Sequence, residues 1–135
     1  MPRLILPLRV LPICLLLGAC AGCPGGQTPA TVAELFFGRS VPGGGTVGEA
    51  EWDAFLADTV TPAFPQGLTV QDAQGQWRGA DGEVVREPAK RLLLVLPETS
   101  ADRADARVAP LAENYRARFR QESVLRLQHA ACVAF

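Results

Sequence analysis

The sequence predicts a single α+β domain with the element order β-α-β-β-α-β. Two observations indicate this class. Four strand-like segments occur along the chain, the first with period-two alternation and the third with a continuous apolar run, and two segments with apolar residues at helical spacing lie between them. A third is length, because about 115 of the 135 residues remain after an N-terminal leader, which suits one domain.

The leader has the form of a bacterial signal peptide of the lipoprotein type, over residues 1–19. Arg3 and Arg9 carry positive charge with no nearby acid, and an apolar run follows at residues 10–17. This run is too short to span a bilayer, which takes about 20 apolar residues, so it predicts export.

The residues Leu17-Gly18-Ala19-Cys20 match a lipobox, which predicts that Cys20 is lipidated and becomes the mature N-terminus. The expected location is therefore the cell envelope, on its periplasmic or outer surface, with a lipid anchor in the membrane. The alternative is cleavage after Ala21, which also fits the small-x-small rule and gives a soluble secreted protein.

Residues 20–30 are rich in glycine and proline and predict a flexible tether before a domain at residues 31–135. Of the four cysteines, Cys23 and Cys132 remain as free thiols after export and lipidation, and an even pair in an oxidising compartment favours a disulfide. Loss of the leader's two arginines changes the formal charge from −1 to −3. This charge argues against a nucleic-acid partner.

The first strand is expected over residues 32–38. The PGGG break at 42–45 precedes a T-x-x-E capping box that begins at Thr46, which predicts a helix from there to Pro62, with Trp52 as the largest core anchor. A second strand over 68–77, with a bulge at Gly75, leads to a hairpin turn at residues 81–82.

The return strand is expected to run from Val84 through Leu96, with Pro88 at a bulge or unpaired edge. Its apolar run at 92–96 predicts a central strand covered on both faces. A second helix follows Thr99 or Ser100, and Pro110 predicts a kink or two shorter helices.

The last strand is expected over residues 123–133, with Leu125 and Leu127 pointing inward. Two β-α-β halves with right-handed crossovers give the ferredoxin-like arrangement, a four-stranded antiparallel sheet with both helices on one face. The first and last strands are then neighbours, which independently brings Cys23 near Cys132.

Five segments carry a resemblance to a known family: FFG (36–38), EWDAFL (51–56), FPQGLTVQDAQGQW (64–77), REPAK (86–90) and RFRQESV (118–124). On these residues the chain resembles the domain of unknown function 3574 family, whose members are small exported bacterial proteins. The resemblance runs from the first strand to the terminal CVAF. It implies no activity, cofactor or catalytic residue.

No catalytic or metal-binding constellation stands out. His129 is the one histidine, so a triad or a His-rich metal site would depend on it alone. Glu49 and Asp53 fit an ordinary acidic first turn of a helix, and the glycines at 43–45 lack the rest of a phosphate-binding motif. We therefore expect no metal and no cofactor.

The best polar cluster lies on the two hairpin strands and comprises Gln76, Trp77, Arg86, Glu87 and Lys90. As a ligand site it would combine an aromatic platform with charges suited to a small anion or sugar, and as structure it would be a cross-strand salt bridge beneath a tryptophan. In a regular strand Arg86 and Glu87 point to opposite faces.

These observations favour a non-enzymatic envelope domain that binds a protein or a small ligand, with a homodimer formed through the uncovered sheet face. The alternative is a small enzyme of the dimeric α+β-barrel type, with a pocket between the sheet and the helices.

Overall fold

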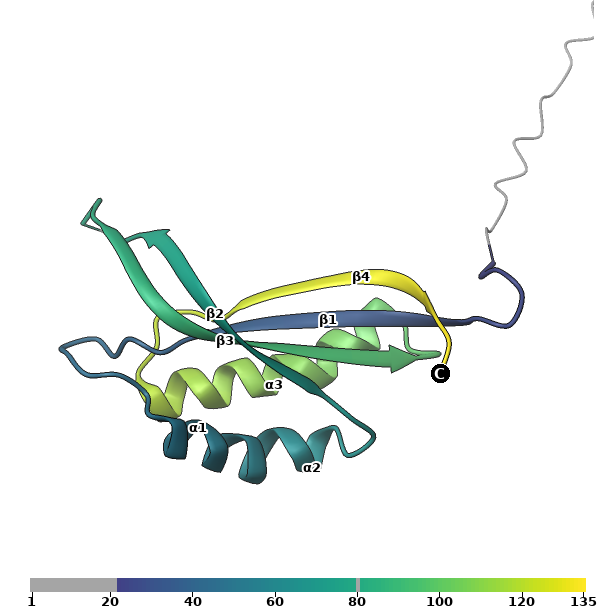
Figure 1. The fold of residues 1–135 in the computed structure, drawn as a ribbon, viewed down its shortest axis with the longest axis horizontal. Helices are drawn as coiled ribbons and strands as arrows, with labels where there is room; N and C mark the ends of the chain where they lie inside the picture. Colours follow the sequence, from purple (N-terminus) through teal and green to yellow (C-terminus); the bar gives the residue numbers. More distant parts are fainter. Residues whose placement is uncertain (1–21, 80) are drawn as a thin grey trace, which may run out of the picture.

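The computed structural model describes residues 22–79 and 81–135, and its elements follow the predicted order (Figure 1). The strands are β1 (Thr28–Gly38), β2 (Thr69–Arg78), β3 (Val84–Pro97) and β4 (Leu125–Val133). The helical segments are α1 (Glu49–Phe55), the π-helical turn η1 (Leu56–Val60), α2 (Thr61–Ala63) and α3 (Ala101–Phe119). None of the helices in this part of the chain is long and apolar enough to cross a membrane.

The four strands form one antiparallel sheet in the order β2-β3-β1-β4, and the helices lie together on one side of it (Figure 1). This is the predicted ferredoxin-like architecture, with β1 and β3 central. β1 begins at Thr28, so residues 28–30, expected in the tether, belong to the first strand.

The core fills the space between the sheet and the helices. Alternate residues of the two central strands, among them Leu35, Phe37, Leu92 and Leu94, are fully buried there. Phe37 contacts the rings of Trp52, Phe55 and Tyr115 in tilted or edge-on geometry, with centroids 4.7 to 5.6 Å apart. Such aromatic pairs add to the stability gained from burial alone.

The first helical region begins later than the capping-box pattern predicts. Thr46 pairs with Ser40 in an isolated β-bridge, and Gly48 is the N-cap, whose N–H donates to Glu51 Oε2 at 2.8 Å. The helical region continues through η1 and ends at Ala63, one residue beyond the expected Pro62.

α3 is one helix of 19 residues, although Pro110 lies inside it. The division into two helices is therefore wrong. Pro110 is on the exposed side, while Val108, Leu111 and Tyr115 pack into the core. Proline removes one intrahelical hydrogen bond, and the buried face on both sides of it keeps the segment helical.

The β2–β3 hairpin has a regular register from Thr69 opposite Leu93 to Arg78 opposite Val84, so the bulge expected at Gly75 is absent from it. Pro88 lies beyond Ala89, the last β3 residue paired with β1, but it pairs with Gln74 of β2, so it occupies neither a bulge nor the expected unpaired edge position. The far half of this hairpin rises away from the helix side of the sheet (Figure 1).

One prediction about the sheet faces is wrong, and another is met on only one face of the described domain. Leu125 and Leu127 are 57% and 46% exposed, because β4 turns Arg126 and Gln128 toward the helices, where both donate to Asp105 of α3. Leu93 and Val95, on the same outer side, are only half-buried, so β3 is covered on one face of the described domain. We call this outer side the open face.

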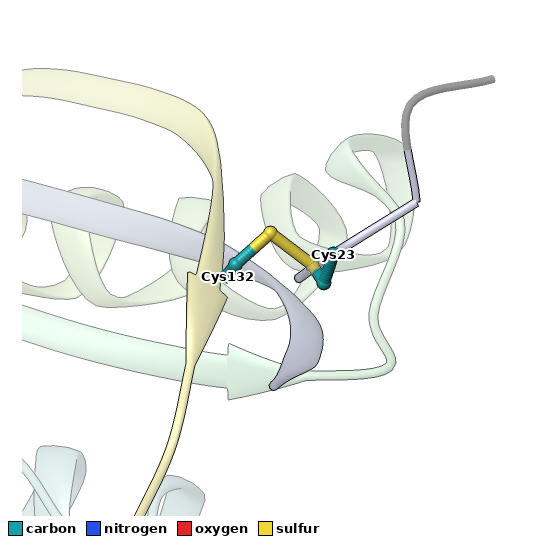
Figure 2. Close-up of a disulfide and its surroundings, with 2 residues drawn as sticks. All are labelled: Cys23 and Cys132. Atoms are coloured by element: carbon teal, nitrogen blue, oxygen red, sulfur yellow. A yellow bond between two sulfur atoms is a disulfide. The ribbon is translucent and has the colours of Figure 1, made fainter. Parts of the chain in front are cut away.

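Cys23 and Cys132 form the predicted disulfide, with their Cα atoms 5.5 Å apart (Figure 2). Cys132 lies opposite Pro29 in the β1–β4 register, so the bridge ties the segment before β1 to the end of β4.

Candidate functional site: a groove on the open face

The described structure contains a groove of about 680 Å³ on the open face. It lies between the far half of the β2–β3 hairpin, the loop that follows β1 and the connection from α3 to β4. We call it the hairpin groove. Its apolar lining comes mostly from the strands: Phe36, Ala73, Trp77, Val85, Ala89 and Leu125.

Glu87 is the polar centre of the groove. Its Oε1 accepts a hydrogen bond from the indole Nε1–H of Trp77, and its Oε2 accepts one from the backbone N–H of Ser40, both at 2.9 Å. Gly38 makes room for this carboxylate, because a Cβ there would lie 2.6 Å from Glu87 Oε1. The carboxylate is therefore held by two segments, the end of β1 with the loop after it, and the neighbouring strand β2.

The chain from Gly38 to Ser40, which forms one wall of the groove, is hydrogen-bonded to α3 and to the segment that follows it. The hydroxyl of Tyr115 donates to the carbonyl of Gly38, and the side-chain amide of Gln121 donates to the carbonyl of Ser40, both at 2.9 Å. Burial raises the pKa of Tyr115 above its usual range, so its hydroxyl keeps the proton that it donates. The groove is thus built on a packed scaffold rather than on a free loop.

The structure divides the predicted polar cluster into two groups. Trp77 and Glu87 line the groove, whereas Arg86 points to the other face, as strand alternation requires, and donates to Gln76 Oε1 at 2.9 Å. Gln76 reaches the groove rim. Lys90 lies on the helix side and does not line the groove.

Lys90 is 6% exposed, and its Nζ donates to Glu49 at 2.8 Å and to Asp72 at 2.5 Å. The hydrogen bonds to these two carboxylates raise the pKa of Lys90, and the hydrogen bond from Lys90 lowers the pKa of each carboxyl. Arg39 also donates to Glu49. This network joins the start of α1 to the sheet, so Lys90 has a structural role.

The remaining candidates do not form a second site. His129 is exposed on the edge strand β4, opposite Val32. The glycines at 43–45 form a turn in which all three have positive φ, a conformation that glycine adopts without strain. Within residues 22–79 and 81–135, no group of three or more His, Cys, Asp or Glu side chains could hold a metal ion.

Sequence reasoning found Trp77 and Glu87 but missed Gly38, Ser40 and Gln121. These three residues belong to loops or strand ends. Gly38 acts through its small size, Ser40 through its backbone, and Gln121 through a side-chain amide that donates to a backbone carbonyl, so none belongs to a periodic pattern.

Together the fold and the groove define a small ferredoxin-like α+β domain with a ligand-sized cavity on its uncovered sheet face. The family model described as "Protein of unknown function (DUF3574)" matches residues 32–135, and the chain belongs to this family. No curated protein matches the chain.

Two solved structures share the fold. A phage SAM lyase in complex with S-methyl-5′-thioadenosine aligns with a TM-score of 0.61 at 17% identity, over 86% of this chain and 95% of that chain. CutA from Synechococcus elongatus PCC7942 aligns with a TM-score of 0.50 at 12% identity, over 77% of this chain and 80% of that chain. At these identities the likeness shows the fold alone.

Proposed function

We propose that this protein is an exported, lipid-anchored envelope domain that binds a small organic ligand in the hairpin groove without transforming it. The observation that carries the proposal is the groove itself, about 680 Å³ in volume, with an apolar lining around the fixed carboxylate of Glu87. Ligand sites in proteins are typically about 300–1,000 Å³, largely apolar and equipped with a few oriented polar groups.

The cellular part of the proposal depends on the leader and the lipobox at Cys20. Mass spectrometry of the mature N-terminus tests it. A diacylated Cys20 at the N-terminus would support lipid anchoring. An unmodified N-terminus produced by cleavage after Ala21 would instead indicate a soluble secreted protein.

The two tryptophans provide a direct test of ligand binding by NMR. Trp77 is 42% exposed in the groove, whereas Trp52 is fully buried in the core on the other side of the sheet. On titration with S-methyl-5′-thioadenosine or with 1-naphthalenemethanol, we expect the indole N–H signal of Trp77 to shift while that of Trp52 stays in place. A Trp77→Phe variant assigns the two signals.

Substitutions inside and outside the groove control this test. Ala73→Phe fills the groove and is expected to weaken binding at least about tenfold. Ala131→Phe adds the same ring to the open face on β4, away from the groove lining, and should leave binding unchanged. The proposal is wrong if neither of these two probes nor the charged naphthyl probes described below moves the Trp77 signal at millimolar concentration.

An enzyme working in the same groove is the second candidate, and the fold shared with a phage SAM lyase gives one reaction to test. The protein is incubated with S-adenosylmethionine, and S-methyl-5′-thioadenosine is sought by chromatography. Its formation by the wild-type chain, and its absence with Glu87→Gln, would replace the binding proposal with the enzymatic one.

We also propose that a second copy of the chain pairs through the half of the open face away from the groove. Leu127, Leu93 and Val95 are apolar residues on that half and outside the groove lining. Sedimentation should show a dimer that Leu127→Lys converts to a monomer. A monomeric wild-type chain would refute the pairing and leave the groove proposal unaffected.

A further inference from the structure

We infer that the hairpin groove selects an organic cation, such as a quaternary ammonium or sulfonium compound with a flat apolar body. The inference rests on the groove being a ligand site, as proposed above, and it specifies the chemical class of the ligand. It differs from the sequence-based expectation of an anion or a sugar.

All charged side chains that line the groove are acidic. Three acidic residues, Asp81, Glu87 and Glu122, line the groove, and the lining includes no lysine, arginine or histidine. An apolar-walled cavity with charge of one sign concentrates ligands of the opposite sign. An anion would therefore meet repulsion here with no compensating donor charge.

The basic residues near the groove are held elsewhere. Arg86 donates to Gln76, and Arg78 donates to the carbonyl of Gly82. Arg39 donates to the carbonyl of Val47 and to Glu49, which also binds Lys90. Arg91, on the open face beside the lining residue Phe36, pairs with Glu34 at 2.7 Å and donates to Gln71. None of these bases is therefore paired with a carboxylate that lines the groove.

Glu87 and Trp77 have the chemistry to recognise a cation. A carboxylate offers about four acceptor positions, and the N–H groups of Trp77 and Ser40 take two of those on Glu87. Both contacts also hold the charge in a fixed position. The partly exposed Trp77 ring adds a π surface in the same groove, and tryptophan is the best aromatic partner for a cation.

The ligand class is organic rather than metallic for two reasons. The described residues contain no group of three or more side chains suited to a metal ion, so the three acids are too dispersed to coordinate one. The lining is also mainly apolar, which suits a body of carbon atoms and not the hydration shell of a hard cation.

Three naphthyl probes of similar size test the inference: naphthylmethyl-trimethylammonium as the cation, 1-naphthalenemethanol as the neutral probe and 1-naphthoate as the anion. Each is titrated into the disulfide-bonded mature chain while the Trp77 indole N–H signal is followed. We expect the cation to bind at least about tenfold more tightly than the neutral probe and the anion to bind most weakly.

Two variants with the same change of charge locate the effect. Glu87→Gln keeps an acceptor for one of the two N–H donors and should reduce the cation's affinity at least about fivefold, with less effect on the neutral probe. Glu83→Gln changes an exposed acid in the hairpin turn, outside the lining, and should leave both affinities unchanged. The intact Trp52 signal reports that each variant is folded.

The outcomes separate this inference from the proposed function. If the cation and the neutral probe bind equally well to the wild-type chain, or the anion binds best, the inference is wrong and the groove remains a ligand site. If no probe of any charge moves the Trp77 signal, the groove is not a ligand site and both are wrong. The wild-type comparison decides the matter even if Glu87→Gln does not fold.

Discussion

Trp77 and Glu87 form a diagonal pair across β2 and β3, with the indole Nε1 2.9 Å from the carboxylate Oε1. They are not directly opposite, because Trp77 pairs with Val85 and Glu87 pairs with Gly75. Diagonal neighbours on a sheet are within reach of long and aromatic side chains.

Replacement of Gly38 by alanine should disturb this pair. The new Cβ would lie 2.6 Å from Glu87 Oε1, so the carboxylate must move away from its two N–H donors. We expect the Trp77 indole N–H signal to shift without any ligand and the affinity for the cationic probe to fall. Gly75→Ala is the matched control, since its Cβ makes only ordinary contacts, at 3.7 Å or more. An unmoved Trp77 signal in Gly38→Ala would contradict the assigned role of Gly38.

The Lys90 network should respond asymmetrically to substitution. In Lys90→Met, Glu49 keeps its hydrogen bond from Arg39 while Asp72 loses Lys90, and both carboxylates are well exposed and gain water instead. In the Glu49→Gln/Asp72→Asn double variant, the buried ammonium loses both charged partners. We expect the double variant to unfold at lower urea concentration than Lys90→Met. The reverse order would show that the lysine is not effectively desolvated.

Acid should weaken the fold through the same network. The pKa values of Glu49 and Asp72 are lowered in the folded state from their ordinary values of 4.5 and 3.8. A depressed pKa contributes stability above the unfolded-state value, and this stability is lost as pH falls through the folded-state value. Urea unfolding at pH 7 and at successive steps below pH 4.5 should show this loss. The double variant Glu49→Gln/Asp72→Asn should lose less stability over the same range, and an equal loss would contradict the prediction.

Reduction of the disulfide should destabilise the domain. Cys23 and Cys132 are 109 residues apart in sequence, so the bridge closes a loop of nearly the whole domain. Removal of a native disulfide from a small secreted domain costs about 2–5 kcal/mol. We expect a lower melting temperature in dithiothreitol and a similar value for the Cys23→Ser/Cys132→Ser variant, which should not respond to the reductant. An unchanged melting temperature on reduction would show that the bridge adds no stability.

The order of the strands and helices could be predicted because each element has its own local sequence pattern. Apolar residues at three- and four-residue spacing predict the buried side of α3: Ala104, Val108, Leu111, Tyr115 and Phe119. The position of β4 beside β1 predicts the disulfide. The alternation in β4 shows which residues share a face but not which face meets the helices. Arg126 and Gln128 reach Asp105 there, and an edge strand accepts long polar side chains on its helix side.

The site was only partly predictable, for a related reason. Trp77 and Glu87 are on adjacent strands joined by a recognisable hairpin turn, so their proximity follows from local patterns. The other half of the groove depends on Ser40 and Gln121, which are 81 residues apart in sequence. The side-chain amide of Gln121 donates to the backbone carbonyl of Ser40. A backbone donor or acceptor is common to nearly all residue types, so no side-chain pattern signals it.

The disulfide also has a consequence for orientation relative to the bilayer. Under the proposed lipidation, only residues 21 and 22 separate the acylated Cys20 from the bridged Cys23, a reach of about 10 Å. The Cys132 end of β4 is then kept beside the headgroups, and the 11-residue β1 extends roughly 35 Å from this end to Gly38. The groove, which Gly38 lines, then lies at the end of β1 that is remote from the lipid anchor.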